Sequence, residues 1–392
     1  MNPEPPPPPD MATPPPAPAP APEPVAEVQA IPRGAGRAGA VAAGGTIAAA
    51  GLLVGATVAG AVLHAPPAFL VIAVTFLPYS YVALIVWTFG LWAVAPDRPS
   101  LPVLLGALVV TGLMLWGPSW GASTETVTGE NLKVMSWNVR RLWGGPSDGE
   151  DPTQCVEAAI KAVDPDVLTL LEVSELDLDQ LSYRLGLQCV HTPYQGSGGR
   201  QVGGLASCVR GDSWTLRKGA PMRFVDDEAW YYAFAEVERD GRVFNLLSVH
   251  LYPYDFSANR LRAGVSGLLS GHPGEIVGLG IEGAETVRAQ GNQSAALLER
   301  VGKFNDPTLV AGDFNSVRDL ALHRSLRGHL VDTWERGGHG QGATVRFLDS
   351  IPLRVDYIYA TESFAVRGAS VPDVGCSDHR PVVTELTLRQ DR

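Results

Sequence analysis

Charged side chains are scarce in this sequence, and basic ones are scarcer than acidic ones. Asp, Glu, Lys and Arg form 18% of the 392 residues, and 41 acidic residues outnumber 30 basic ones. The imbalance persists over 131–392, which holds 27 Lys and Arg against 34 Asp and Glu. Proteins that bind nucleic acid without sequence preference need Lys and Arg to neutralise phosphates. We therefore expect no specific nucleic-acid partner.

Cysteine is also rare, with four residues at positions 155, 189, 208 and 376. No pair has the Cys-x-x-Cys spacing of a zinc site, so we expect no metal bound through sulfur. In a hairpin centred on 198–199, Cys189 and Cys208 would lie opposite each other. One interpretation is a disulfide, which requires the closer of the two strand registers and a non-cytosolic location. The simpler interpretation is two small buried side chains.

The first 38 residues almost lack large apolar side chains and consist largely of Pro and Ala. Such a segment favours extended polyproline II and builds no core, which predicts a disordered tail, with an SH3-type ligand as the alternative.

Residues 39–120 almost lack charge instead. Two apolar stretches, 39–63 and 68–95, meet the roughly 20 residues that cross a bilayer, and a third, 101–116, is shorter; together they predict a membrane anchor of three transmembrane helices. The late start of the first stretch argues against a cleaved signal peptide. Arg33, Arg37 and Arg98 mark the cytoplasmic side, which places the linker 121–131 and the domain 132–392 outside the plasma membrane.

The domain 132–392 is rich in strand patterns. Asp240-Gly241 is a hairpin signal, and Asp151-Pro152 has the composition of a helix start. The expected strands are 132–139, 166–171, 187–192, 203–210, 230–239, 242–251, 308–312, 354–359 and 381–388, and the expected helices are 151–163, 176–185 and 284–303. This pattern predicts an α/β fold of two mixed sheets packed face to face with helices outside. The stretch 252–282 has no clear place and is expected to be a loop that covers the site or simply lies on the surface.

Polar side chains stand at the ends of these expected strands. A single Glu at a strand end is more often a cap or an ion-pair partner than a functional group. Asp313 and Asn315 are a better pair, because residues two apart on an extended chain face the same side. Gly312 beside them allows a ligand or a backbone to come close. The clusters, in chain order, are SWN (136–138), LLE (170–172), SVHL (248–251), GDFN (312–315), VDYIY (355–359) and SDH (377–379).

In this order the clusters resemble the endonuclease/exonuclease/phosphatase superfamily, which includes pancreatic-type DNases, abasic-site endonucleases, neutral sphingomyelinases and inositol polyphosphate 5-phosphatases. The resemblance covers 132–388 and implies a four-layer α/β sandwich. It also implies a Mg²⁺- or Mn²⁺-dependent hydrolase of phosphate esters. The layout of three spans and a domain resembles the vancomycin/teicoplanin-resistance membrane proteins.

The resemblance assigns a role to each cluster. Metal ligands would be Glu172, Asn138 and Asp378. Asp313 would orient or deprotonate the attacking water, and His379, oriented by Asp356, would stabilise the scissile phosphate. Asn315 and His250 would hold phosphoryl oxygens. Several nuclease members have an acid where this sequence has Arg140, which is either a phosphate ligand or a surface residue.

These expectations favour a membrane-anchored phosphatase or phosphodiesterase that acts on a lipid-linked or membrane-derived phosphate, with the bilayer as a partner. An anchored extracellular nuclease is the alternative, and the acidic composition counts against it. A catalytically silent binding module is a third possibility, which the chemically competent residues at every motif position disfavour.

Overall fold

The computed structural model describes residues 68–390, except 95–98, 117–118, 122–126, 143–150, 196–200, 213, 225–229, 255–257, 273 and 348–350, and a few residues between 44 and 51. The expected tail 1–38 lies outside the described residues, as does most of the first expected span.

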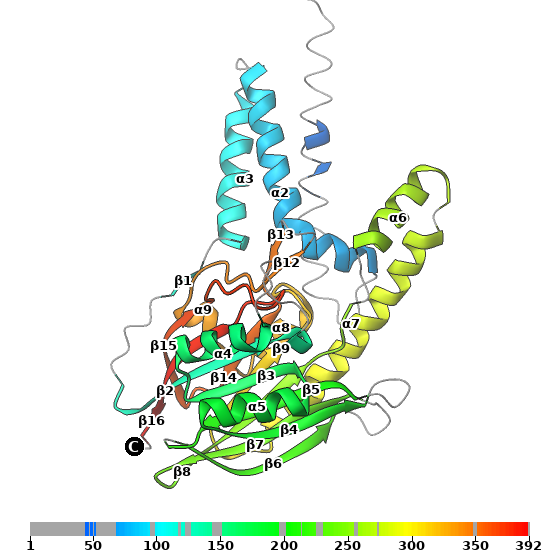
Figure 1. The fold of residues 1–392 in the computed structure, drawn as a ribbon. Coiled ribbons are helices and arrows are strands. Elements are labelled where there is room, and N and C mark those ends of the chain that lie inside the picture. Colours follow the sequence, from blue (N-terminus) through cyan, green and yellow to red (C-terminus); the bar gives the residue numbers. More distant parts are fainter. Residues whose placement is uncertain are drawn as a thin grey trace, which may run out of the picture.

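Two six-stranded sheets form the centre of the domain (Figure 1). In the first, of order β15-β16-β2-β3-β5-β4, β2 and β3 run parallel and the other neighbours run antiparallel. Its strands are β2 (Gly129–Asn138), β3 (Val167–Val173), β4 (Leu187–Gln195), β5 (Gln201–Arg210), β15 (Phe364–Ser370) and β16 (Val382–Arg389).

The second sheet has the order β10-β14-β9-β8-β7-β6, and here β8 and β9 are the parallel pair. Both sheets are therefore mixed, as predicted. Its strands are β6 (Thr215–Arg223), β7 (Tyr231–Arg239), β8 (Arg242–His250), β9 (Thr308–Asp313), β10 (Val331–Asp332) and β14 (Asp356–Ala360). Two small sheets pair β1 (Ser119–Trp120) with β11 (His339–Gly340) and β12 (Val345–Phe347) with β13 (Ile351–Leu353).

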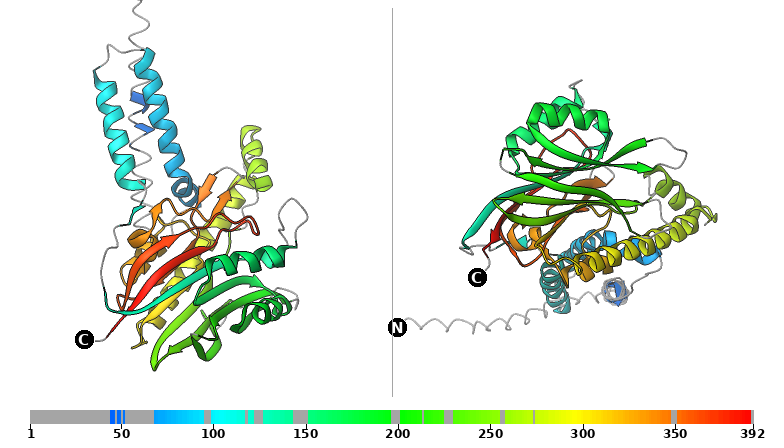
Figure 2. Two further views of the ribbon diagram at one scale, coloured as in Figure 1. Left: turned by 60° about the vertical axis from the view of Figure 1, so that its left-hand side comes forward. Right: turned by 90° about the horizontal axis from the view of Figure 1, so that it is seen from below.

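Three apolar clusters separate four layers, helices, sheet, sheet and helices (Figure 2). The middle cluster joins the two sheets, with Val134 of β2 and Leu246 of β8 among its members. One outer cluster lies under α4 (Pro152–Val163) and α5 (Glu175–Leu185). The other includes residues of α7 (Gly274–Val301) and α8 (Ala321–Arg327), and α9 (Thr333–Gly337) is a short further helix. The layers match the predicted architecture.

The sequence signals for local structure act as expected at one helix start and one turn. Asp151 caps α4 by accepting from the Thr153 amide, and the structure adds a cap at α5, where Ser174 accepts from the Asp177 amide. Asp240 and Gly241 both have positive φ in the turn between β7 and β8, as a two-residue hairpin requires.

The expected loop 252–282 is wrong for most of its length. It forms α6 (Ala258–Leu269) and the first turns of α7, which begins at Gly274 instead of 284. A Cβ on Gly264 would lie only 3.2 Å from Ile276 Cδ1, so glycine at this position lets the two helices pack closely.

Two expected spans correspond to α2 (Ala68–Val94) and α3 (Ser100–Trp116). Within the described part of the chain, no helix combines the length and the apolarity that crossing a bilayer requires. The expectation of three spans is therefore not supported. At 17 residues, α3 is short for a crossing, since it extends about 25 Å against a hydrocarbon core of about 30 Å.

Candidate active site

Three strands of the second sheet end in a row of polar residues. The parallel pairing of β8 and β9 places His250 beside Asp313, and the antiparallel pairing of β14 and β9 places Asp356 on the other side of Asp313. All three side chains are buried. The sheet register thus aligns three of the predicted site residues at one edge.

Two backbone features allow this alignment. A Cβ on Gly312, at φ 152°, would lie 1.8 Å from the Val249 carbonyl oxygen, so only glycine permits this approach of β9 to β8. In the other sheet, the pairing of β3 with β5 shifts between Leu171 and Val173, and Glu172 between them has φ 55°. Such a bulge turns a side chain away from the regular alternation of a strand, here toward the site.

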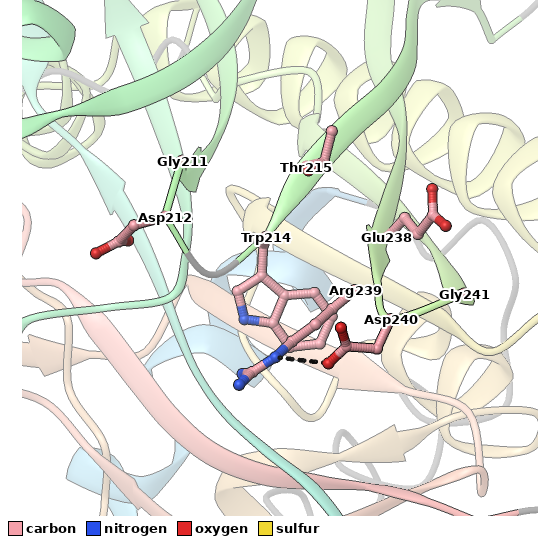
Figure 3. Close-up of a pocket in the computed structure, with 8 residues that line it drawn as sticks. All are labelled: Gly211, Asp212, Trp214, Thr215, Glu238, Arg239, Asp240 and Gly241. Atoms are coloured by element: carbon pink, nitrogen blue, oxygen red, sulfur yellow. Dashed lines mark ion pairs between the residues drawn. The ribbon is translucent and has the colours of Figure 1, made fainter.

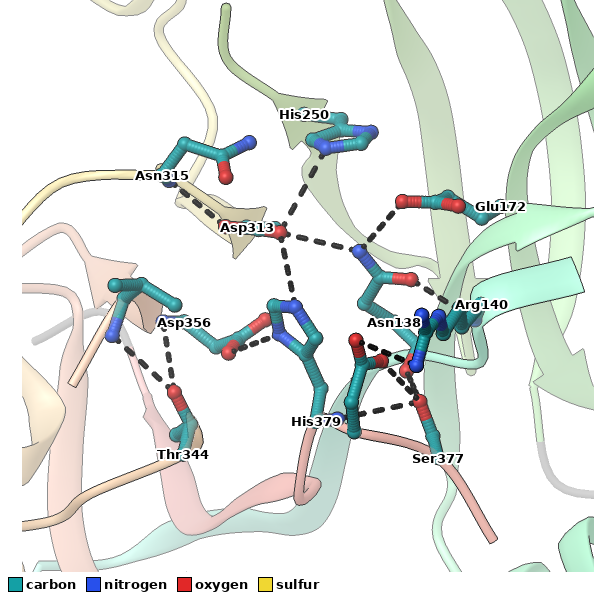
Figure 4. A network of polar contacts seen from close by, with 12 residues as sticks. Asn138, Arg140, Glu172, His250, Asp313, Asn315, Thr344, Asp356, Ser377 and His379 are labelled. Atoms are coloured by element: carbon teal, nitrogen blue, oxygen red, sulfur yellow. Dashed lines mark hydrogen bonds and ion pairs between the residues drawn. The ribbon is translucent and has the colours of Figure 1, made fainter. Parts of the chain in front are cut away.

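Asn138 connects the two sheets (Figure 4). Its Nδ2 donates hydrogen bonds to Glu172 Oε1 and to Asp313 Oδ2, both at 3.1 Å. Asn138 and Glu172 lie at the ends of β2 and β3 in the first sheet, and Asp313 lies at the end of β9 in the second. Each sheet therefore contributes one carboxylate to the same amide group. Glu172 and Asp313 are therefore close although they come from opposite layers.

His379 lies between two carboxylates. Its Nδ1 is 2.9 Å from Asp356 Oδ2, and its Nε2 is 3.8 Å from Asp313 Oδ2. Burial alone would lower the pKa of His379, but the charges of Asp356 and Asp313 outweigh it and raise this pKa to about 10. A protonated ring that donates through Nδ1 to Asp356 directs its Nε2–H toward Asp313.

Thr344 and the pairing of β14 with β9 hold Asp356 in place. The backbone amide of Asp356 donates to the Thr344 hydroxyl at 3.3 Å, and burial raises the pKa of the Asp356 carboxyl. Thr344 lies outside the predicted clusters, because a single threonine in an irregular segment has no distinguishing pattern.

His250 and Asn315 complete the surroundings of Asp313. His250 Nε2 lies 3.6 Å from Asp313 Oδ2, and the Asn315 amide donates to Asp313 Oδ1 at 2.7 Å. Asn315 Nδ2 donates one hydrogen bond to the Leu251 carbonyl at 3.0 Å, which fixes the side-chain amide and leaves its second hydrogen for other acceptors.

Asp378 and Arg140 lie at the more exposed side of the site. Arg140 NH1 is 3.1 Å from Asp378 Oδ2, with about half of each side chain exposed. The backbone of Arg140, at φ 45°, donates to Asn138 Oδ1. The structure thus pairs the predicted metal ligand Asp378 with the arginine considered for phosphate binding.

The donor set of the site fits a hard divalent cation. Glu172 and Asp313 offer carboxylate oxygens, which suit Mg²⁺ or Mn²⁺. The Asn138 amide turns its Nδ2 to these carboxylates, and its oxygen would face a cation only after a rotation of the amide. Within the described residues, atoms of Asp313, Asp356 and His379 also lie within 4.8 Å of one another, but the protonated His379 ring offers no lone pair to a cation. Carboxylates gathered from both sheets are a favourable environment for a cation.

Buried hydroxyls connect the sheets beneath the site; Ser248 belongs to the SVHL cluster, whereas Ser207 and Thr169 lie outside the predicted clusters. Ser248 Oγ is 2.7 Å from Ser207 Oγ and 3.1 Å from Thr169 Oγ1, and all three side chains are fully buried. Buried hydroxyls that satisfy one another fix the register of the layers that carry them.

The structure contains two disulfides among the four cysteines. Cys189 and Cys208 are directly opposed in β4 and β5, as predicted for a hairpin centred on 198–199. They form a disulfide with a Cα–Cα distance of 4.1 Å. Cys155 and Cys376 form a second bridge with a Cα–Cα distance of 5.7 Å, and no sequence pattern predicts it across a separation of 221 residues.

A pocket of about 500 Å³ lies at the other end of β7 and β8, around their Asp240-Gly241 turn (Figure 3). Its floor includes Trp214, over which the Arg239 guanidinium lies at 5.5 Å from the ring centre. None of its lining residues belongs to the predicted clusters, and His250 is at the opposite end of β8. We place the chemistry at His250 and not at this pocket, because the titratable pairs converge there.

Comparison with known proteins points to one family. Residues 135–379 match the model of the Endonuclease/Exonuclease/phosphatase family. No curated protein matches the chain. The catalytic domain of human Nocturnin with bound sulfate is similar in structure, with a TM-score of 0.50 and 19% identity over 68% of this chain and 95% of that one. A family protein from Bacteroides thetaiotaomicron has a TM-score of 0.50 and 17% identity over 67% and 100%. These likenesses concern the fold.

Proposed function

This chain belongs to the endonuclease/exonuclease/phosphatase family and is a phosphate-ester hydrolase, and we propose that it cleaves a lipid-linked or membrane-derived phosphate with the help of a divalent cation. The observation that carries the proposal is the position of Asp313. It lies between the two imidazoles of His250 and His379 and contacts Asn138 from the opposite sheet.

Asp313 is the proton acceptor in this proposal. A water molecule beside its buried carboxylate loses a proton to Oδ2 as its oxygen attacks phosphorus, and the ester P–O bond opposite breaks, its oxygen leaving as an alcohol after it takes a proton from solvent. The Nε2–H of protonated His379 stabilises the charge that develops on the phosphoryl oxygens, and His250 and Asn315 hold these oxygens. Asp356 keeps His379 in its orientation through Nδ1.

Glu172 and Asn138 are the proposed cation ligands. Mg²⁺ or Mn²⁺ at this position would supply Lewis-acid stabilisation of the phosphoryl group. Asp378, which we expected as a further ligand, is proposed to act near the cation through its contact with Arg140. Arg140 in turn offers a guanidinium for the substrate phosphate.

The apolar helices next to the site support a substrate at a lipid surface. The hydroxyl of Tyr79 in α2 donates to the Pro352 carbonyl of β13. β13 pairs with β12, and Val345 of β12 forms a bridge with His379. Helix α2 therefore rests on the strand pair that adjoins the catalytic histidine.

We also propose that α2 and α3 attach the protein to a bilayer, with the catalytic domain on the exoplasmic side of the plasma membrane. The two helices expose Val86, Trp87 and Leu113 by about 60% each, which is an unusual amount of apolar surface in contact with water. Two disulfides support an oxidising location.

The test compares substrates on the purified full-length protein with Mg²⁺, using a prenyl diphosphate, a phosphodiester phospholipid and plasmid DNA. We expect cleavage of a lipid substrate that disappears on chelation and returns with Mg²⁺ or Mn²⁺. Preferential cleavage of DNA would establish the nuclease alternative. Failure to cleave any of the three, with metal present, would contradict the proposal.

A further inference from the structure

The residues 371–381 between β15 and β16 form a loop that holds catalytic groups without regular structure. It contains Ser377 and His379, and its only ladder contact is the isolated bridge of His379 with Val345. A loop that carries a catalytic side chain needs other constraints to hold that side chain within a fraction of an ångström.

Hydrogen bonds constrain the second half of this loop. The Trp137 indole donates to the His379 carbonyl at 2.9 Å, and the Ser377 hydroxyl donates to the Asn138 carbonyl at 2.8 Å. The Arg380 amide donates to the Thr344 carbonyl at 2.7 Å. These contacts fix residues 377–380 to β2 and to the segment before β12.

The disulfide constrains the loop at the residue before these contacts begin. Cys376 is completely buried and bonded to Cys155 in the first half of α4. The buried face of α4, including Val156 and Ile160, packs in the same cluster as Trp137. The bond therefore joins the loop to the layer that also supports the strand of Asn138.

We propose that the Cys155–Cys376 disulfide is a positioning element of the reaction: it holds the 371–381 loop so that His379 faces Asp313, and its reduction lowers turnover. This inference rests on the proposed hydrolase function. A dithiol reduces the bond by two exchanges. It first forms a mixed disulfide with the more exposed Cys155 and releases Cys376 as a thiol, and then it closes to a cyclic disulfide and releases Cys155 as a thiol.

The second disulfide provides a matched control. Cys189–Cys208 also joins one partly buried and one fully buried cysteine. It connects opposed residues of two strands that already form a hydrogen-bonded ladder, 19 residues apart in sequence. Its removal also eliminates one disulfide bond, but it frees no loop that carries a predicted catalytic residue.

The experiment compares the full-length wild type with C155A/C376A and C189A/C208A. Turnover and KM are measured with bis(4-nitrophenyl) phosphate and Mg²⁺, before and after dithiothreitol, at a temperature where circular dichroism shows all three folded. Hydrogen exchange of the peptide covering 371–381 is measured by mass spectrometry on the same samples.

We expect C155A/C376A to lose at least about tenfold in kcat, with a smaller change in KM and faster exchange in the loop. Dithiothreitol should reproduce this loss in the wild type and in C189A/C208A and have no further effect on C155A/C376A.

Equal losses in the two double variants, or wild-type turnover and exchange in C155A/C376A, would overturn the proposal. If the wild type hydrolyses no phosphate ester, the proposed function fails. The hydrogen-exchange data then still test whether the Cys155–Cys376 disulfide holds the 371–381 loop, since they require no activity.

Discussion

Asp313 is the residue on which the polar side chains of the site converge, with contacts to Asn138, His250 and His379. Replacement by Asn keeps the shape of this buried side chain and removes its basicity. We expect Asp313→Asn to lower kcat by about 10²–10⁴-fold, the usual contribution of a general base. Asp306→Asn, at an exposed position before the same strand, is the control. Retention of more than about a tenth of wild-type turnover would remove Asp313 from this role.

Glu172 is the proposed main ligand of the cation, because its carboxylate is directed to the site by a bulge. We expect Glu172→Gln to raise the Mg²⁺ concentration for half-maximal activity at least about tenfold, with less effect on KM. Glu175→Gln, an exposed residue in the first turn of α5, should leave the Mg²⁺ titration unchanged. An unaltered titration for Glu172→Gln would show that the cation binds elsewhere.

His379 makes the stability of the metal-free protein depend on pH. Although burial opposes it, Asp356 and Asp313 raise the pKa of His379 from 6.5 to about 10. Because the pKa is higher in the folded state, protonation of His379 stabilises the folded protein fully below pH 6.5. This contribution to the free energy of unfolding disappears as the pH rises toward 10.

The unfolding free energy of the wild type should therefore exceed that of His379→Gln by an amount that falls by about 1–4 kcal/mol between these pH values. Denaturant titrations in a chelator measure this difference. A difference that stays constant with pH would show that the ring is not held as a cation.

At the scale of elements, the approach of β9 to β8 depends on Gly312. In Gly312→Ala, the methyl group would meet the Val249 carbonyl at 1.8 Å, so the two strands must separate and displace Asp313 and His250. We expect a loss of at least about 2 kcal/mol in the free energy of unfolding, together with loss of activity. Gly278→Ala in α7, where a Cβ meets nothing within 4 Å, should instead stabilise by about 0.5–1 kcal/mol. Thermal unfolding of both variants tests the contrast.

Elements with a continuous apolar run or a capping signal were predictable from the sequence, whereas β6, β15 and α8 were not among the expected elements. The apolar run of β3 and the cap of α4 gave correct positions. β6 was missed because it is a half-exposed edge strand with Pro221 and several charges, and so it has no apolar alternation.

The predictable part of the site was the set of polar residues at strand ends. Its arrangement was not predictable, because it depends on which strands pair. The alignment of His250, Asp313 and Asp356 results from one parallel and one antiparallel pairing around β9. The contact of Asn138 with Asp313 exists only because two sheets from distant parts of the chain face each other.

At the scale of the whole molecule, α2 and α3 give the protein an apolar side. The two helices bury Tyr81, Leu84 and Leu108 between them and expose other large apolar side chains. We expect the full-length protein to float with phospholipid vesicles in a density gradient. Each buried Val or Leu contributes about 1.5–3 kcal/mol, so V86E/L113E should reduce the vesicle-bound fraction strongly. Leu176→Glu, on the exposed face of α5, is the matched control. Equal flotation of all three proteins would contradict attachment through these helices.

Strand β16 has a central place in its sheet. It lies between β15 and β2, and eight of its residues pair with β2. During synthesis, the strand that carries Asn138 therefore gains its second neighbour only after residues 382–389 have left the ribosome. His379, only a few residues before β16, emerges at nearly the same stage. A chain truncated before residue 379 thus lacks both the histidine and the strand that completes the sheet behind the site.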